Sequence, residues 1–254
     1  YMEKYIIDGR HIEFQIMADA FGGVVYLGER ECSAQRRHQK LVEESPSPVM
    51  DPETRKDLGE KLRVAMRRIG YRNAGTVEFF RDSNGHIYFM EVNARLQVEH
   101  PVTEQVTGRD LVTEQLHVAA NEALSFDQHE IEMNGHSIEC RINAEDPFDD
   151  FKPSPGEVTE FAPPQEIAGV KVRVDSHVQP GYRIPVYYDS LIAKLIVWGP
   201  DRDAARNGMI KALESFHVGG VKTTIPVHLQ IMRDPDFAAG NYDTGFIARL
   251  LAEG

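Results

Sequence analysis

The sequence lacks the features that would place the protein in a membrane or on nucleic acid. No apolar run in its 254 residues approaches the length of a membrane-spanning helix. The net charge of −12 argues against a general nucleic-acid surface, although it leaves room for a local basic pocket that binds phosphates. A Gly-rich phosphate loop of a recognised kind is also missing. We therefore expect neither a membrane nor a nucleic acid as a partner.

Cysteine is scarce as well. Cys32 and Cys140 are the two cysteines of the chain, and they lie far apart without the spacing of a metal site. We expect both to be reduced, which predicts a cytoplasmic location, or the mitochondrial matrix if the source is eukaryotic. The hydrophobic share of 41% and the charged share of 27% are typical of a soluble globular protein with one large or two ordinary domains.

Two carboxylates are predicted to face each other across a β-hairpin. The dipeptide Asn84-Gly85 lies between β-rich runs and predicts a two-residue turn. With that turn, Phe80 pairs with Phe89 and Glu78 pairs with Glu91. Like charges directly opposite each other destabilise a sheet, so this register indicates a cation between the two carboxylates.

The residues after Glu91 extend this polar face. Asn93 and Arg95 follow at two-residue spacing, which places them beside Glu91 on one face of the strand. Carboxylate and amide oxygens suit Mg²⁺ or Mn²⁺, which often complete their coordination shells with substrate phosphates. The alternative is a solvated polar face, and a longer loop or a bulge would change the register.

Alternation and helix signals predict the other elements of the first half. Residues 11–17 alternate as a half-buried strand, and residues 24–27 form a second strand. Asp51-Pro52 begins a helix that ends at Gly70, and another helix spans about 109–120. The buried stripe of the first helix is predicted to contain Leu58, Leu62, Ala65, Met66 and Ile69.

The second half has a different pattern. It predicts short strands at 139–143, 156–161, 170–174 and 190–198, and a helix over 202–216. Mixed antiparallel strands with flanking helices indicate an α+β fold. The last helix is expected to face inward through Ala205, Met209, Ala212, Leu213 and Phe216.

Five segments in order carry a more specific pattern. They read MEKY (2–5), ECSAQRRHQK (31–40), GYRNAGTVEF (70–79), EVNARLQVEHPVTE (91–104) and ECRINAEDP (139–147). Together they resemble biotin carboxylase, the ATP-grasp component of biotin-dependent carboxylases. The resemblance implies the C-terminal part of an ATP-grasp domain over 1–123, an antiparallel sheet with helices, followed by a biotin carboxylase C-terminal domain over 138–246. The residues HPVTE (100–104) are more similar to acetyl-CoA and propionyl-CoA carboxylases than to pyruvate carboxylase.

The resemblance implies that ATP and bicarbonate form carboxyphosphate, from which CO₂ passes to N1 of a biotin on a carrier protein. The residues that match ATP-binding positions are Glu3, Lys4, Tyr5, Ile6, His11, Gln35, His38, Glu78 and Glu91. Those that match the Mg²⁺ or Mn²⁺ site are Glu78, Glu91 and Asn93. Those that match the bicarbonate pocket are Lys40, Arg95, Gln97, Val98 and Glu99.

Four of these positions form the expected catalytic set. Glu99 matches the base that deprotonates bicarbonate, and Arg141 matches the residue that binds biotin and stabilises its enolate. Lys40 and Arg95 complete the set, and Asp189 is expected near the biotin pocket. Taken singly, these residues have structural alternatives, which are core histidines for His11 and His38, a solvent-facing acid for Glu99 and an ion-pair partner for Arg141.

The resemblance also implies partners. They are a biotin carboxyl carrier protein or domain, a carboxyltransferase, and a second copy in a homodimer, for which Arg173 matches an interface position. Family members carry an N-terminal domain and a lid before the matched region, so we expect a fragment with little or no activity alone. Two other functions stay open: another ATP-grasp ligase, such as a carbamoyl-phosphate synthetase relative, and a non-catalytic dimerisation module.

Overall fold

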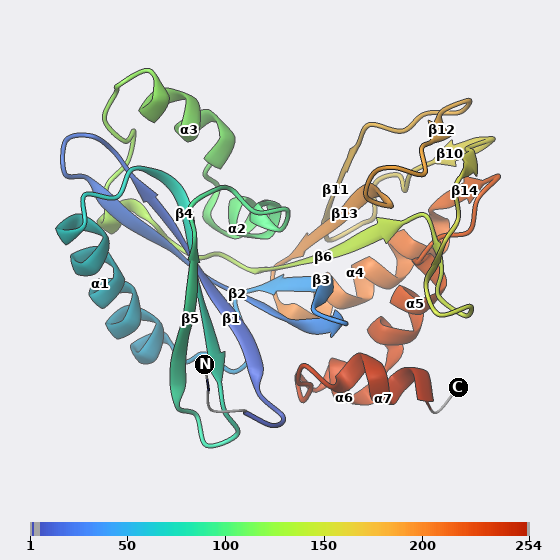
Figure 1. Cartoon of the computed structure of the whole chain (residues 1–254), viewed down its shortest axis with the longest axis horizontal. Coiled ribbons are helices and arrows are strands. Elements are labelled where there is room, and N and C mark those ends of the chain that lie inside the picture. Colours follow the sequence, from blue (N-terminus) through green and yellow to red (C-terminus); the bar gives the residue numbers. More distant parts are fainter. Residues whose placement is uncertain (1, 3–5, 253–254) are drawn as a thin grey trace.

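An eight-stranded antiparallel sheet forms the centre of the molecule (Figure 1). The computed structural model describes residue 2 and residues 6–252. The strand order is β11-β13-β6-β3-β2-β1-β4-β5. In chain order these strands are β1 (Arg10–Ala18), β2 (Val24–Arg36), β3 (Gln39–Ser45), β4 (Asn73–Arg81), β5 (Ile87–Asn93), β6 (His136–Asn143), β11 (Lys171–Ser176) and β13 (Leu191–Gly199).

Helices flank this sheet, which confirms the α+β fold. In Figure 1, α1 and α3 lie toward one end of the molecule and α4 to α7 toward the other. The helices are α1 (Pro52–Arg68), α2 (His100–Thr107), α3 (Leu111–Ala119), η1 (Gln128–Glu130), α4 (Arg202–Ser215), α5 (Ile225–Arg233), α6 (Pro235–Ala238) and α7 (Phe246–Ala252). The sheet continues from β3 to β6, so the domain boundaries at 1–123 and 138–246 stay a prediction.

The first two strands are more deeply buried than the sequence suggested. Every residue of β1 is buried, so the expectation of a half-buried strand is wrong. One face, with Ile12, Phe14 and Ile16, packs against α1 residues. The other face carries polar side chains that are covered by distant segments, as described below. The strand expected at 24–27 extends to Arg36 because the charged residues that follow find buried partners.

The first helix begins and ends as predicted. The Asp51 carboxylate accepts from the amides of Glu53 and Thr54, and Gly70 takes the left-handed conformation at φ +67°. Its buried stripe is narrower than expected, because Leu62 and Met66 are buried whereas Ile69 is 68% exposed. Leu58 is half-buried and Ala65 is exposed.

A helix that the sequence did not reveal follows β5. The strand face expected to continue through Arg95 ends at Asn93, and α2 begins at His100. Pro101 lies in the first turn of α2, and Gly108 ends the helix in the left-handed conformation. The next helix, α3, begins two residues later than expected, at Leu111, because Asp110 caps it.

The predicted hairpin register is right at the carboxylates and wrong at the turn. The connection is longer than two residues, and Arg81 pairs with Ile87, Phe80 with Tyr88. The expected pairing of Phe80 with Phe89 is therefore incorrect. A bulge that leaves Met90 unpaired corrects the register by one residue, so Glu78 does pair with Glu91.

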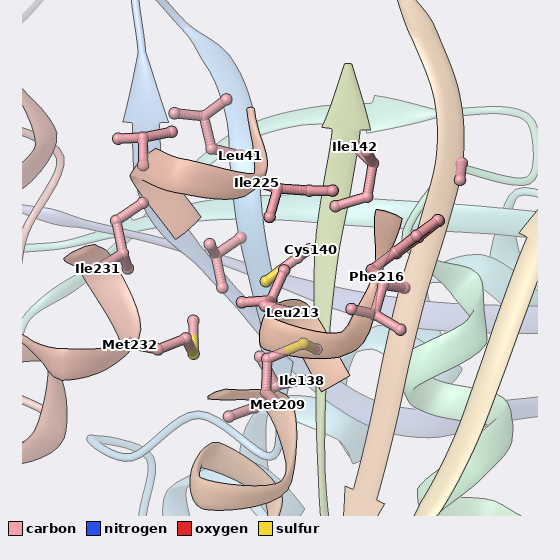
Figure 2. Close-up of a cluster of buried hydrophobic side chains, with 14 of the residues drawn as sticks. Leu41, Ile138, Cys140, Ile142, Met209, Leu213, Phe216, Ile225, Ile231 and Met232 are labelled. Carbon is pink, nitrogen blue, oxygen red and sulfur yellow. The ribbon is translucent and has the colours of Figure 1, made fainter. Parts of the chain in front are cut away.

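The second half surrounds the larger apolar core, part of which Figure 2 shows. All five residues expected to face inward from α4 belong to it, including Met209 and Leu213. The strand predicted at 156–161 is instead two short strands in separate small sheets. The short strands are β7 (Glu145–Asp146), β8 (Lys152–Pro153), β9 (Gly156–Glu157), β10 (Glu160–Ala162), β12 (Arg183–Ile184) and β14 (His217–Gly219).

None of the helices in the described part of the chain has the length and apolar character needed to cross a bilayer.

Candidate active site

One cavity of about 850 Å³ gathers most of the predicted site residues. Its walls come from β1, the β2–β3 hairpin, β4, β5, the loop before α2, β6 and the segment before β13. These elements are far apart in sequence, and the antiparallel sheet brings their polar side chains together. The predicted residues that line the cavity are His11, His38, Lys40, Glu78, Glu91, Asn93, Arg95, Gln97, Val98, Glu99, Arg141 and Asp189.

A neighbouring cavity of about 550 Å³ holds the other described positions. It is lined by Ile6, Gln35 and His38 together with apolar side chains such as Phe80 and Met90. His38 lines both cavities, so the two spaces meet at the tip of the β2–β3 hairpin. The predicted ATP-binding residues Glu3, Lys4 and Tyr5 lie outside the described residues.

The two facing carboxylates lie on the same side of the sheet. The Asn93 amide nitrogen donates to Glu78 at 3.0 Å and to Glu91 at 3.2 Å. Burial opposes ionisation of Glu78, but hydrogen bonds from His11 and Gln97 and the charge of Lys40 lower its pKa to about 2. Glu91 is exposed to the cavity. Two carboxylates and an amide oxygen fit a hard divalent cation. To bind it, the Asn93 amide would present its oxygen, rather than its nitrogen, to the ion.

Arg95 departs from the predicted arrangement. It lies beyond the end of β5, so it does not continue the strand face that holds Glu91 and Asn93. Its guanidinium donates to the Leu96 carbonyl at 3.3 Å and is exposed. Arg95 still lines the same cavity, where its charge can meet an anion.

Next to the carboxylates is a chain of alternating charges. Lys40 donates to Glu13 at 2.5 Å and to Glu99, and it lies 3.6 Å from Glu78. Glu99 in turn accepts from Arg141 at 2.9 Å. Glu99 is 2% exposed, so its alternative reading as a solvent-facing acid is incorrect. The arrangement places a buried carboxylate between two cations at the edge of the cavity.

The loop that carries Glu99 is held in place by contacts with β13 and β4. Lys194 donates to the Val98 carbonyl at 3.0 Å and lies 3.5 Å from Asp175. The side chain of Gln97 is buried and donates to Glu78 at 2.8 Å. Asp189 also lines the cavity, and its carboxylate accepts from the amide of Leu191 at 2.8 Å.

Sequence reasoning missed a buried ion pair beneath the site. Arg30 is fully buried and donates to Glu13 at 2.6 Å and Gln15 at 2.7 Å. It also donates to Thr103 of α2 at 3.0 Å and to Thr76 of β4 at 3.2 Å. The alternation of polar residues along β1 was the available signal, because His11, Glu13 and Gln15 share one face.

Glu13 gives a prediction for pH dependence. Burial opposes its ionisation, but the charges of Arg30 and Lys40 lower its pKa from 4.5 to about 2. A carboxyl whose folded-state pKa is depressed stabilises the fold above its unfolded pKa, and that stabilisation disappears as the pH falls through the folded value. We expect Glu13→Gln to lower the free energy of unfolding most at neutral pH, with the deficit shrinking below pH 4.5.

Urea unfolding across this pH range checks the prediction. Glu60→Gln is the matched control, because the side chain of Glu60 on α1 is 45% exposed and pairs with Arg63. A deficit for Glu13→Gln that is the same at all pH values would contradict the account.

Comparisons with known proteins match both halves of the chain. Residues 1–126 match the family model of the carbamoyl-phosphate synthase L chain, ATP binding domain. Residues 139–249 match the biotin carboxylase C-terminal domain. The first match ends at residue 126, between α3 and β6, and the second begins at residue 139, within β6.

Curated relatives are similar along the whole chain. Biotin carboxylase of Nostoc sp. is 53% identical over 250 residues, which are 98% of this chain and 55% of that protein. A pyruvate carboxylase subunit from Methanothermobacter thermautotrophicus is 56% identical over 247 residues, which are 97% of this chain and 50% of that protein. The chain thus spans about half the length of the curated relatives it matches.

A solved structure has the same fold. The biotin carboxylase domain dimer of Hydrogenobacter thermophilus 2-oxoglutarate carboxylase, in complex with MgADP, ADP and bicarbonate, matches with a TM-score of 0.95 and 49% identity. The match covers 98% of this chain and 55% of that chain. Both family models, relatives at about half identity and this structural match agree with the motifs of the sequence, and the chain belongs to the biotin carboxylase family.

Proposed function

We propose that this chain supplies the catalytic cavity of an ATP- and bicarbonate-dependent biotin carboxylase. The observation that carries the proposal is the adjacency, in one cavity, of the Glu78–Glu91 carboxylate pair and the Lys40–Glu99–Arg141 charge chain. The first group suits a metal-bound nucleotide, and the second suits a small anion and its deprotonation.

The contacts support the following proposed roles. Glu78, Glu91 and Asn93 would hold Mg²⁺ or Mn²⁺, which when bound offsets charge on the nucleotide phosphates. Glu99 accepts the proton of bicarbonate, while the adjacent cations Lys40 and Arg141 keep its negative charge compensated. The remaining residues assigned to ATP are Ile6, His11, Gln35 and His38, and those assigned to bicarbonate are Arg95, Gln97 and Val98.

We propose that Arg141 contacts biotin in addition to its ion pair with Glu99. Its guanidinium lines the cavity and is held on its inner side by Glu43 at 2.6 Å. A cation fixed in this way can stabilise the oxyanion that forms on biotin when N1 loses its proton. Asp189, which lines the same cavity, is proposed to contact the same ligand.

The partners of the whole enzyme are also proposals. Biotin would arrive on a carrier protein or domain, and a carboxyltransferase would use the product. Relatives of similar identity include proteins named for pyruvate and 2-oxoglutarate, so the expected acyl-CoA assignment stays a prediction. Buried, unpaired Cys32 and Cys140 support a reducing, cytoplasm-like compartment.

A homodimer is proposed on the likeness to the Hydrogenobacter domain dimer. Arg173, the expected interface residue, lies on the edge strand β11. Its guanidinium already donates to Glu104 at 2.7 Å and to Asp175 at 2.8 Å within the chain. Native mass spectrometry tests self-association, and a monomer at high protein concentration would contradict it.

Carboxylation of free biotin tests the function. A hybrid joins this chain to the unmatched part of Nostoc biotin carboxylase and receives ATP, Mg²⁺ and labelled bicarbonate. We expect biotin-dependent incorporation of the label. Carbamoyl phosphate formation without biotin dependence would instead favour the second candidate, a carbamoyl-phosphate synthetase-like ligase, which the match of residues 1–126 brings forward. Absence of Mg²⁺-ATP binding by the hybrid would favour a non-catalytic module.

A further inference from the structure

A second pair of acidic residues lies behind Arg141 and has no role in the proposed reaction. Glu43 on β3 and Glu139 on β6 are cross-strand partners, and both are fully buried. Their chain neighbours Val42, Ile138 and Cys140 belong to the core that includes α4. Because side chains alternate along a strand, the two acids point to the other face, against which α2 packs.

The hydrogen bonding of this pair is incomplete. One oxygen of Glu43 accepts from Arg141 Nε at 2.6 Å. Among the described residues, the other oxygen of Glu43 and both oxygens of Glu139 have no hydrogen-bond partner. A buried ionised carboxylate without partners is very costly, and a second one beside it adds repulsion. A single proton between Glu139 and the free oxygen of Glu43 would give that oxygen and one oxygen of Glu139 a hydrogen-bond partner, and would leave one negative charge instead of two.

The charges around the pair agree with one shared proton. Arg141 and Lys40 act on Glu43, and Arg141 and Lys194 act on Glu139, whereas Glu99 repels both acids. The ionisable residues of the overlying α2 are His100 and Glu104, and Cys140 lies on the opposite sheet face. The cations are already engaged, since Lys40 and Arg141 contact Glu99 and Lys194 contacts Val98 and Asp175. A third full negative charge beside Arg141 would therefore be uncompensated.

The directions of the two pKa shifts agree with a shared proton. Burial and the charge of Glu43 raise the pKa of Glu139 well above its ordinary value. Burial raises the pKa of Glu43 to about 7 even though Arg141 opposes the shift.

We propose that Glu43 and Glu139 hold one proton between them and act as a positioning pair for the guanidinium of Arg141. The single negative charge on Glu43 holds Nε and one terminal nitrogen of Arg141, and the same terminal nitrogen contacts Glu99 at the cavity. The consequence for catalysis rests on the proposed role of Arg141, but the shared proton and the position of Arg141 do not require turnover.

Infrared spectroscopy of the 254-residue chain tests the shared proton. The carbonyl stretch of a protonated carboxylic acid is resolved from that of a carboxylate, and the difference between wild type and Glu139→Gln isolates this residue. We expect an acid band at neutral pH that disappears in Glu139→Gln and persists in Glu130→Gln, an exposed control. No difference between wild type and Glu139→Gln at neutral pH would overturn the proposal.

The second measurement follows Arg141 itself. In a chain labelled with ¹⁵N-arginine, the Nε–H signal of Arg141 is the one missing from Arg141→Lys. We expect Glu139→Gln, which keeps a neutral hydrogen-bonding group, to leave this signal in place, and Glu43→Gln to shift it. A signal that Glu43→Gln leaves unmoved would overturn the positioning role.

The wild-type chain provides the decisive result if Glu43→Gln does not fold. Its Arg141 signal is then expected to shift with rising pH together with loss of the acid band, and a pH-independent signal would overturn the proposal. Failure of the proposed function is a separate outcome, since it would appear as no biotin carboxylation by the hybrid with both spectroscopic results intact.

Discussion

Replacing Arg30 by methionine is expected to lower the free energy of unfolding by about 3–5 kcal/mol, the usual effect of removing one partner of a buried ion pair. Arg30 is fully buried, and its guanidinium donates to five side chains on β1, β4, α2 and the loop before α2. Without it, Glu13 loses one of its two principal cations while remaining out of contact with water. Urea unfolding followed by circular dichroism measures the change.

Two further variants identify the cause of this loss. Arg233→Met removes an arginine whose pair with Glu214 is exposed, and surface pairs of this kind contribute about 0–1 kcal/mol. Glu13→Gln combined with Arg30→Met is expected to be less destabilising than the sum of the two single changes, because no buried charge is left alone. Equal losses for Arg30→Met and Arg233→Met would show that the buried network is not what stabilises this part of the fold.

Replacing Glu99 by glutamine is expected to lower kcat for biotin carboxylation by about 10²–10⁴, the range that general-base catalysis supplies. Glutamine has a similar shape but cannot accept a proton, which is the role proposed for Glu99 toward bicarbonate. The KM for ATP should change little, since Glu99 lies beside Lys40 and Arg141 rather than in the neighbouring cavity with Ile6 and Gln35. The measurement uses the hybrid enzyme described above.

The control for this prediction is Glu122→Gln, which changes an exposed glutamate paired with His117 far from the cavity. It should leave kcat and both KM values unchanged. A Glu99→Gln hybrid that retains the wild-type kcat would remove Glu99 from the reaction and leave it a purely structural ion-pair partner.

The hairpin shows how much of the site local patterns could predict. The facing of Glu78 and Glu91 was derived from a two-residue turn, yet the structure reaches it through a longer loop and a bulge at Met90. The longer loop shifts the pairing by one residue and the bulge shifts it back. Glu78 therefore pairs with Glu91 as predicted, whereas Phe80, which lies between the loop and the bulge, pairs with Tyr88. Bulges depend on side-chain packing across strands, which a single sequence does not display.

Burial of charge was harder to predict than secondary structure. The strand at β1 and the caps of α1 follow from alternation and capping residues, which are local signals. The burial of Arg30 depends on α2, which packs against β2 and places Thr103 beside the Arg30 guanidinium, although the two residues are 73 positions apart in the chain. Glu43 and Glu139 were overlooked for the same reason, since only the pairing of β3 with β6 brings them together.

Family motifs located the cavity residues that local patterns could not connect. Twelve predicted positions line one cavity, although they come from segments spread from His11 to Asp189. Their shared location supports the assigned roles, which remain proposals. Arg95 shows where the two-residue spacing of a strand fails as a predictor. The spacing predicts Arg95 on the face of β5, but Arg95 lies in the loop that follows β5.

Binding of Mn²⁺ tests the metal site most directly. Electron paramagnetic resonance can titrate the 254-residue chain with Mn²⁺ in the presence of a non-hydrolysable ATP analogue. The account predicts a bound ion that is lost in Glu91→Gln, because Glu91 faces Glu78 across the hairpin, and retained in Glu130→Gln, which alters the exposed cluster of Asp127, His129 and Glu130. Binding that Glu91→Gln leaves intact, or that Glu130→Gln abolishes, would contradict a divalent cation shared by the two facing carboxylates.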